Sequence, residues 1–388
     1  MKTDYLHDEM VQWRRDFHAH PELGFQEERT SARVAELLTI FGLEVHRGVG
    51  GTGVVGVLQK GNATRSIGLR ADMDALPIHE ATDLPYRSNN DGVMHACGHD
   101  GHTTMLLGAA RYLSERGTFQ GRAVFIFQPN EEHGLGAARM IEDGLFERFD
   151  VDDVYGMHNI PGMPVGHFAT RSGPMTASES LFEIAIEGRG GHAAMPHMGV
   201  DAILVGSAIA TALQTIVARK LDPAESGVVS VTEFITDGKR NVLPGNATLK
   251  GDARALTPTT NHLIENRMRE ISESVAVAHG AKASVTYETI FPPTINKPEA
   301  SARAVTAAEM VFGRENVDGD CPPKLFSEDF AHLANARPGA FVLTGNGTEG
   351  CHARPLHSAD YDFNDEALVP GASFWAALVE QELSGKEA

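Results

Sequence analysis

Two hydrophobic periods alternate along the first part of the chain. Residues 4–19 and 27–41 carry apolar side chains three and four positions apart, which predicts two amphipathic helices. Further helices are predicted near 102–115 and 135–143. Short runs rich in β-branched and aromatic residues predict strands at 52–58, 66–76, 122–128 and 152–159. Strands that alternate with helices are typical of an α/β domain with a mostly parallel sheet.

The pattern changes after residue 178. A long helix is predicted from 199 and another from 258. The strands around these helices are predicted at 180–190, 227–235, 246–256 and 282–290. The resulting order βαββαβ is the split arrangement of a ferredoxin-like unit. Beyond residue 292 the α/β character returns, with a strand at 339–345 and a final helix from about 364.

These patterns predict an α/β domain that is interrupted by an inserted ferredoxin-like α+β domain. We expect the first domain to comprise residues 1–175 and 292–388, and the inserted domain residues 176–291. Hinges are expected near 173–177 and 292–294. The first strand of the inserted domain and its helix from 199 are candidates for a dimer interface, because an unpaired sheet edge invites pairing.

Length, charge and cysteine content restrict the class of protein. The 388 residues exceed one typical core, which favours two domains. A net charge of −19 repels phosphate backbones and anionic lipid, so we expect neither nucleic-acid nor membrane partners. The N-terminus does not resemble a signal peptide, and the apolar stretch 202–218 is just too short to cross a bilayer, which predicts a buried helix. Three widely spaced cysteines (Cys97, Cys321 and Cys351) predict no disulfide framework and a cytoplasmic location.

Polar clusters follow the strands of the α/β domain at the points where these strands end. In open parallel sheets the functional crevice lies beyond the carboxyl ends of the strands, so the clusters are expected to gather there. The segment "HACGHDGHT" (95–103) begins a loop that enters a helix and reaches the same rim. The residues expected to gather are Asp72, Asp74, Cys97, His99, Glu131, Glu132 and His158, with His357 from late in the chain.

The donor types in these clusters indicate a metal site. Borderline and transition metals accept imidazole, carboxylate and thiolate together, whereas magnesium and calcium prefer oxygen alone. The mixed set consists of Cys97, His99, Glu132, His158 and His357. Five ligands exceed one open catalytic site, so two ions fit better, with Cys97 as the candidate bridging ligand. Taken singly, each residue has an ordinary explanation as a buried thiol, a helix cap or a turn; their coincidence favours the metal site.

Eight sequence blocks resemble those of the M20 metallopeptidases and occur in the same order. The blocks are "LRADMDALP", "HACGHDGHT", "FQPNEE", "GMHN", "GRGGHAAMPH", "NVLPGNATLKGDAR", "SEDF" and "LHSADYDFND". The chain most resembles the subfamily of hippurate hydrolases, bacterial N-acyl-amino-acid amidohydrolases and plant auxin-conjugate hydrolases. The resemblance covers nearly the whole chain, and it is far more specific for the family than for the substrate. It implies a metallohydrolase domain interrupted by a smaller lid and dimerisation domain, and hence a homodimer or higher homo-oligomer.

The resemblance also implies roles for individual residues. It implies two divalent ions, zinc first with manganese, cobalt or nickel as alternatives, bound by Cys97, His99, Glu132, His158 and His357. Glu131 is the implied general base, and Asp74 the implied carboxylate that orients a metal-ligating imidazole. Asn130 and Ala359 differ from the residues common at these positions and bear only on loop conformation.

The implied reaction is hydrolysis of the amide between an acyl group and an amino acid, which are released as a carboxylic acid and a free amino acid. Glu131 deprotonates the attacking water and returns the proton to the leaving amine. His192 is the candidate donor to the oxyanion, presented across a dimer interface; alternatively it only lines the lid. Arg254, with Asn241, suits the α-carboxylate of the substrate, or Arg254 makes a surface salt bridge.

Other classes share part of this pattern. A di- or carboxypeptidase, or a deacetylase of an N-acetylated diamino acid such as N-acetyl-diaminopimelate, would use the same metal site. A non-catalytic metal-binding protein whose lid serves assembly is a further alternative. The adjacent pair Glu131 and Glu132 argues against that alternative, because a storage site needs no spare base beside its ligand.

Overall fold

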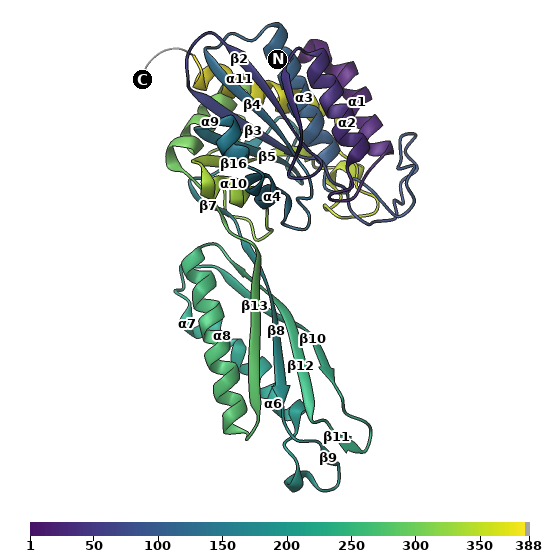
Figure 1. Ribbon diagram of the computed structural model, residues 1–388, viewed down its shortest axis with the longest axis vertical. Coiled ribbons are helices and arrows are strands. Elements are labelled where there is room, and N and C mark those ends of the chain that lie inside the picture. Colours follow the sequence, from purple (N-terminus) through teal and green to yellow (C-terminus); the bar gives the residue numbers. More distant parts are fainter. Residues whose placement is uncertain (385–388) are drawn as a thin grey trace. The chain divides into compact units, whose positions relative to one another are not determined.

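The computed structural model describes residues 1–384 and divides the chain into two compact units (Figure 1). Unit 2 comprises Thr176–Thr294 and Pro323–Glu328, and unit 1 the rest. The first boundary lies where the sequence pattern changes, whereas the second follows Thr294 rather than residue 291. No sequence pattern predicted that residues 323–328 belong to unit 2 rather than to unit 1. Their membership of unit 2 results from backbone pairing, because the Ala177 N–H donates to the Phe326 carbonyl over 3.0 Å.

Unit 1 is built on an eight-stranded mixed sheet. In spatial order the strands are β1 (Glu44–Val49), β2 (Gly53–Lys60), β4 (Gly121–Gln128), β3 (Ser66–Asp72), β5 (Asp153–Pro161), β16 (Gly339–Gly347), β6 (Phe168–Ala169) and β15 (Val317–Asp318). The four neighbours β4, β3, β5 and β16 run parallel, whereas β1 and β2 extend the sheet antiparallel. The predicted α/β fold with a mostly parallel central sheet is confirmed.

Helices cover both faces of this sheet (Figure 1). Along β4, Ala123, Phe125 and Phe127 face one core, in which five helices take part, because side chains alternate along a strand. These helices are α1 (His7–Ala19), α2 (Glu28–Ile40), α3 (His99–Glu115), α9 (Pro298–Phe312) and α11 (Leu368–Glu382). On the other face, the ring centroid of Phe330, in α10 (Phe330–Ala336), lies 5.5 Å from that of Phe341. Helix α10 also contacts α4 (Gly136–Glu142), and α5 (Leu145–Phe149) follows α4 in the chain.

Helix α9 has no counterpart among the elements expected from the sequence. Its buried face consists largely of alanines, including Ala300, Ala304 and Ala307. Small side chains contribute little to a hydrophobic period, although they allow the helix to pack closely on the sheet. The final helix also begins later than expected, at Leu368, after a 3-10 turn at Asp365–Ala367.

Unit 2 has the predicted βαββαβ order. Its sheet runs β10–β12–β8–β13, and every neighbouring pair is antiparallel, as in a ferredoxin-like unit. The strands are β8 (Ser178–Glu187), β10 (Gly227–Thr236), β12 (Asn246–Ala255) and β13 (Lys282–Phe291). The first strand, β8, is paired on both sides, so the expectation that it offers an unpaired edge is wrong; the edges are β10 and β13. The helices are α6 (Ala202–Leu213), α7 (Thr215–Lys220) and α8 (Pro258–Ala278). Short strands β9 (Gly191–His192) and β11 (Val242–Leu243) pair with each other. The short strands β7 (Gly173–Thr176) and β14 (Thr294–Asn296), most of whose residues belong to unit 1, form a separate pair.

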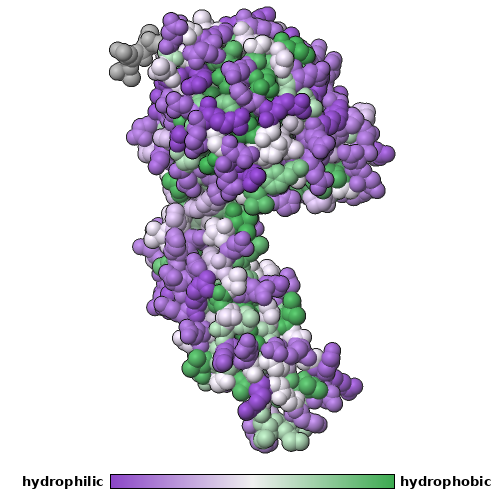
Figure 2. Space-filling model, viewed as in Figure 1, coloured by the Kyte–Doolittle hydropathy of each residue, from purple (hydrophilic) through white to green (hydrophobic). Residues whose placement is uncertain are grey.

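The apolar helical stretch of unit 2 corrects one expectation. The run Ala202–Lys220 is 19 residues long, and by length and composition it suffices to cross a membrane, so the expectation that it is too short is wrong. It is also only a third buried. Val205 and Ile209 face the sheet, whereas Ile203 and Leu204 are 43% and 58% exposed. The face of unit 2 visible in Figure 2 likewise carries hydrophobic residues among hydrophilic ones.

Candidate metal and catalytic site

A tight turn delivers the "HACGHDGHT" segment to the end of the sheet. Gly98 separates Cys97 from His99 and has a φ of 88°, in the left-handed region that favours glycine. A Cβ at this position would lie 2.3 Å from the Asn159 side-chain oxygen. Only glycine therefore lets Cys97 approach the end of β5 while His99 begins helix α3.

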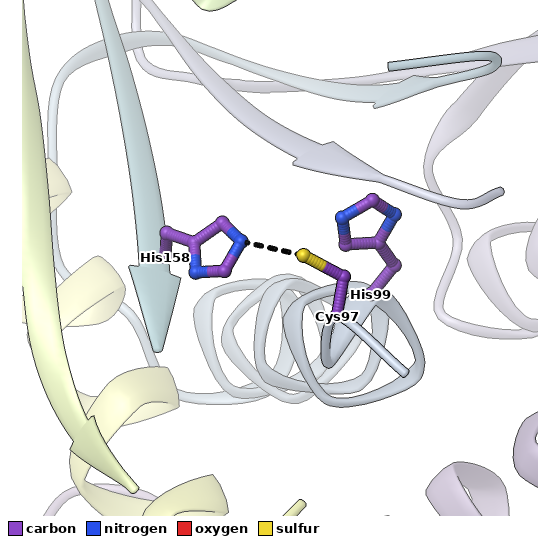
Figure 3. Close-up of side chains that lie close together, drawn as sticks. All are labelled: Cys97, His99 and His158. Atoms are coloured by element: carbon purple, nitrogen blue, oxygen red, sulfur yellow. Dashed lines mark hydrogen bonds between the residues drawn. The ribbon is translucent and has the colours of Figure 1, made fainter. Parts of the chain in front are cut away.

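A first group of possible ligands joins strand β5 to the start of helix α3. Cys97, His99 and His158 are all buried, and one donor atom from each lies within 4.8 Å of the others. The Cys97 Sγ is 3.3 Å from the His158 Nε2 (Figure 3). His158 projects from β5, whereas the other two stand at the start of α3. The expected convergence at the carboxyl end of the sheet is thus present.

A second group includes the remaining two candidates. Cys97, Glu132 and His357 also place their donor atoms within 4.8 Å of one another. The Glu132 Oε2 lies 3.4 Å from the His357 Nε2, and the Glu132 Oε1 lies 3.8 Å from the His99 Nε2. The His357 side chain is 52% exposed, and its backbone N–H donates to the Ala96 carbonyl over 2.8 Å. Cys97 belongs to both groups, which is the geometry expected of a shared ligand.

Hydrogen bonds fix which imidazole nitrogens face this crevice. The His99 Nδ1 donates to the Asp74 carbonyl over 2.8 Å and lies 3.3 Å from the Asp74 carboxylate. The His158 Nδ1 donates to the Asn159 carbonyl over 2.6 Å. Each ring therefore turns its Nε2 toward the crevice, where this nitrogen can bind a metal in place of a proton. The buried His99 Nε2 and Glu132 Oε1 have no hydrogen-bond partner within the described residues 1–384.

The charges around these atoms favour a cation. Burial raises the pKa of the Cys97 thiol, and the nearby Glu132 and Glu131 raise it further. Burial lowers the pKa of His99, but Asp72 and the other carboxylates outweigh this effect and raise it to about 10. A buried polar atom without a hydrogen-bond partner costs free energy of folding. A bound cation would satisfy such atoms here and would neutralise the neighbouring carboxylates. The thiol, imidazole and carboxylate set therefore fits divalent metals of the zinc type.

Glu131 lies beside this ligand set. Its Oε2 is 4.0 Å from the His99 Nε2, and the backbone N–H of Asp329 donates to its Oε1 over 3.4 Å. The residue is 6% exposed. The next residue, Glu132, is held by its backbone N–H, which donates to the Asp74 carboxylate over 3.0 Å. The two adjacent glutamates are thus held by different hydrogen bonds, Glu131 by that from Asp329 and Glu132 by that to Asp74.

One buried histidine of the site was not among the expected functional residues. The His102 Nδ1 lies 2.7 Å from the Asp72 carboxylate, and its ring centroid is 4.5 Å from that of His158. Arg70 pairs with the other oxygen of Asp72 over 2.7 Å. The sequence signal was present, because His102 follows His99 by three positions and therefore shares its side of α3.

The three expected residues of unit 2 fall into two places within that unit. His192 and Asn241 are exposed and lie together at the paired strands β9 and β11, where the Ala193 N–H donates to the Asn241 carbonyl over 3.0 Å. Arg254 lies near the opposite end of the ten-residue strand β12, roughly 25 Å away at a rise of about 3.3 Å per residue.

Arg254 makes salt bridges within unit 2, as in the alternative interpretation that gave it no role in substrate binding. Its Nε donates to the Asp252 carboxylate over 2.8 Å, and another guanidinium nitrogen lies 3.1 Å from Glu179. It also donates to the Ser327 hydroxyl over 2.6 Å. A substrate carboxylate at Arg254 would have to share the guanidinium with these partners.

Comparisons with known proteins agree with this architecture. Residues 68–381 match the family model "Peptidase family M20/M25/M40". The chain is 43% identical to a hippurate hydrolase of Campylobacter jejuni, covering 96% of both chains. It is 38% identical to thermostable carboxypeptidase 1 of Saccharolobus solfataricus, covering 96% of this chain and 95% of the relative. The solved YXEP protein of Bacillus subtilis, described as a dinuclear metal-binding peptidase of the M20 family, superposes with a TM-score of 0.86 at 32% identity, covering 98% of this chain and 99% of that one. The family match and this full-length similarity show that the chain belongs to peptidase family M20/M25/M40 and is an enzyme that hydrolyses amide bonds.

Proposed function

We propose that this enzyme hydrolyses N-acyl amino acids, in the manner of a hippurate hydrolase or N-acyl-L-amino acid amidohydrolase. The observation that carries the proposal is the 43% identity to a hippurate hydrolase over 96% of both chains. The products are a carboxylic acid and a free amino acid. A carboxypeptidase is the second candidate, favoured by a 38% identical relative of that name; an N-acetyl-diaminopimelate deacetylase would use the same donors.

The proposed cofactor is a pair of divalent ions. Cys97 belongs to both donor groups, one completed by His99 and His158 and the other by Glu132 and His357, which supports a pair of sites that share the thiolate. When bound, such ions polarise a carbonyl and make water more acidic. Zinc suits these donors best, and manganese, cobalt and nickel also suit them.

The proton transfers are assigned to Glu131. Its carboxylate takes a proton from the attacking water and later gives it to the leaving amine nitrogen. His192 is the proposed donor to the oxyanion of the tetrahedral intermediate. The Ala194 N–H donates to the His192 Nδ1 over 3.0 Å, so the neutral ring carries its proton at Nε2 and can donate it. Arg254 and Asn241 are the proposed partners of the substrate carboxylate.

These assignments require two copies of the chain. Arg254 and Asn241 are too far apart within unit 2 to bind one carboxylate, so we assign Asn241 and His192 to a second copy. The edge strand β10 carries exposed Phe234 and Ile235, and the neighbouring α6 exposes Ile203 and Leu204. An unpaired strand edge beside exposed apolar residues is typical of a subunit interface.

The proposed dimer predicts that Leu204→Glu together with Ile235→Glu yields monomers. Two charges placed at the buried centre of an apolar interface disfavour association. Sedimentation velocity measures the change, and activity should fall with it because the second copy supplies His192. Val277→Glu is the matched control, since Val277 is also exposed in unit 2, on α8. A monomeric variant with wild-type activity would contradict the assignment.

A substrate panel tests the proposed function. The chelated protein is reloaded with zinc, manganese, cobalt or nickel and given N-acetyl, N-benzoyl and N-indolylacetyl amino acids, free dipeptides and N-acetyl-diaminopimelate. We expect no turnover without metal, and a higher kcat/KM for N-acyl amino acids than for dipeptides. Elemental analysis should find two ions per chain. Preference for free dipeptides would favour the carboxypeptidase instead. The cytoplasmic location stays a prediction.

A further inference from the structure

The loop that carries Glu131 and Glu132 is held by buried carboxylates. It connects β4 to α4; two backbone N–H groups of the loop, and one from the first turn of α4, each donate to a different carboxylate. The bonds join Asn130 to Glu27 over 2.9 Å, Glu132 to Asp74 over 3.0 Å and Ala137 to Asp329 over 3.0 Å. Asp74 and Asp329 also contact other parts of the site. Glu27 has no part in the mechanism described above.

Glu27 lies at the junction of three separate segments. It directly precedes helix α2, and its Oε1 accepts the Asn130 N–H. Its Oε2 accepts the hydroxyl of Thr52, from the turn between β1 and β2, over 2.5 Å. The residue is 0% exposed. Burial raises the pKa of Glu27 to about 6, so the carboxylate is kept there at a cost in free energy.

The residue that Glu27 binds has an unusual backbone. Asn130 has a φ of 49°, in the left-handed region that few residues other than glycine adopt. Its side chain packs against Gly24, where a Cβ would lie 1.8 Å from the Asn130 Oδ1. The segment 24–27 therefore contacts both the side chain and the backbone of Asn130. Because Asn130 directly precedes Glu131, its backbone conformation sets the direction of the Glu131 side chain.

We propose that Glu27 is a positioning residue, which holds the Asn130 peptide in its left-handed conformation and thereby aims the Glu131 carboxylate. Its carboxylate accepts hydrogen bonds from Asn130 and Thr52, so it acts through the loop and not through a proposed ligand. The inference rests on the proposed role of Glu131 as general base. The role of Glu27 is geometric. It requires a hydrogen-bond acceptor at the position of Oε1, but it does not require the negative charge of the carboxylate.

Two variants of Glu27 separate geometry from charge. Glu27→Ala removes the acceptor, and a base displaced by about 1 Å is expected to lower kcat by roughly 10- to 100-fold. KM and metal content should stay at wild-type values, because Asp74 still holds the Glu132 N–H. Glu27→Gln keeps a carbonyl oxygen for Asn130 and an amide for Thr52, so its kcat should stay within about threefold of wild type. A glutamine variant as impaired as the alanine variant would overturn the geometric role.

Glu22 offers a matched control in the same segment. Its carboxylate accepts the N–H groups of Arg29 (3.0 Å) and Thr30 (2.8 Å), so it caps α2 without contacting the loop. Glu22→Ala should lower Tm and leave kcat unchanged. If Glu27→Ala lowers Tm in the same way but keeps the wild-type kcat, Glu27 is merely structural and the inference fails.

A variant outside Glu27 tests the inference even if Glu27→Ala does not fold. Gly24→Ala leaves Glu27 intact and displaces the Asn130 side chain, and its kcat should fall at unchanged KM. Full activity of this variant would overturn the inference. Failure of the proposed function is a separate result, visible in the wild-type enzyme as absence of turnover of N-acyl amino acids. In that case kcat is compared on the substrate that the panel identifies.

Discussion

Replacing Glu131 with glutamine is expected to lower kcat for N-acyl amino acids by about 10²- to 10⁴-fold, the range for loss of a general base. The amide has nearly the size of the carboxylate and can still accept the Asp329 N–H, which lies 3.4 Å away in the wild type. It cannot take a proton from water at neutral pH. Steady-state kinetics on the metal-loaded variant measures the loss, and KM should change little.

Metal content separates a base from a ligand. Glu131→Gln should retain two ions per chain by elemental analysis. Cys97→Ala should lose metal together with activity, because Cys97 belongs to both donor groups. Undiminished turnover by Glu131→Gln would remove Glu131 from the mechanism. Loss of metal from that variant would instead make Glu131 a ligand.

The second large effect is on stability. Arg14→Met is expected to lower the free energy of unfolding by about 3–5 kcal/mol, as when one partner of a buried ion pair is removed. The Arg14 guanidinium is fully buried and lies 2.7 Å from Asp365, 3.3 Å from Asp362 and 3.7 Å from Asp100. Methionine fills much of the same space and leaves these carboxylates without that cation. Urea or guanidinium titration of both proteins measures the difference.

Arg15 provides the matched control. It pairs with the same Asp365 over 2.9 Å and lies 4.5 Å from the Tyr86 ring, compared with 4.4 Å for Arg14. Its side chain is 45% exposed, so solvent screens the pair. Arg15→Met should therefore cost less than about 1 kcal/mol. Equal losses in the two variants would refute the argument from burial.

The strand and helix periods predicted most of the architecture. Runs such as 122–128 were recognisable because each buried strand is short, apolar and followed by a polar cluster. The ferredoxin-like order of unit 2 was predicted in the same way and appears in its sheet. Helix α9 was missed because its buried alanines carry little hydrophobic signal.

The convergence of the candidate donors was predictable for a related reason. Parallel strands bring their carboxyl ends to one edge, so polar clusters after β3, β4 and β5 had to approach one another. The structure brings His158, from the second half of β5, to the donors of the "CGH" segment, which in turn lie beside those of the "EE" segment. Proximity in this case follows from topology, which the sequence pattern already contained.

The sequence by itself determined most of the elements, their βαββαβ order in unit 2 and the donors that gather at the sheet edge, because these depend on local periodicity and on which residues follow each strand. The tertiary structure alone decided how these donors are supported. The bond from Asn130 to Glu27, the return of 323–328 to unit 2 and the contact of His102 with Asp72 each join segments that no local pattern relates. Such contacts depend on the side-chain packing of the whole unit, which a one-dimensional pattern does not specify.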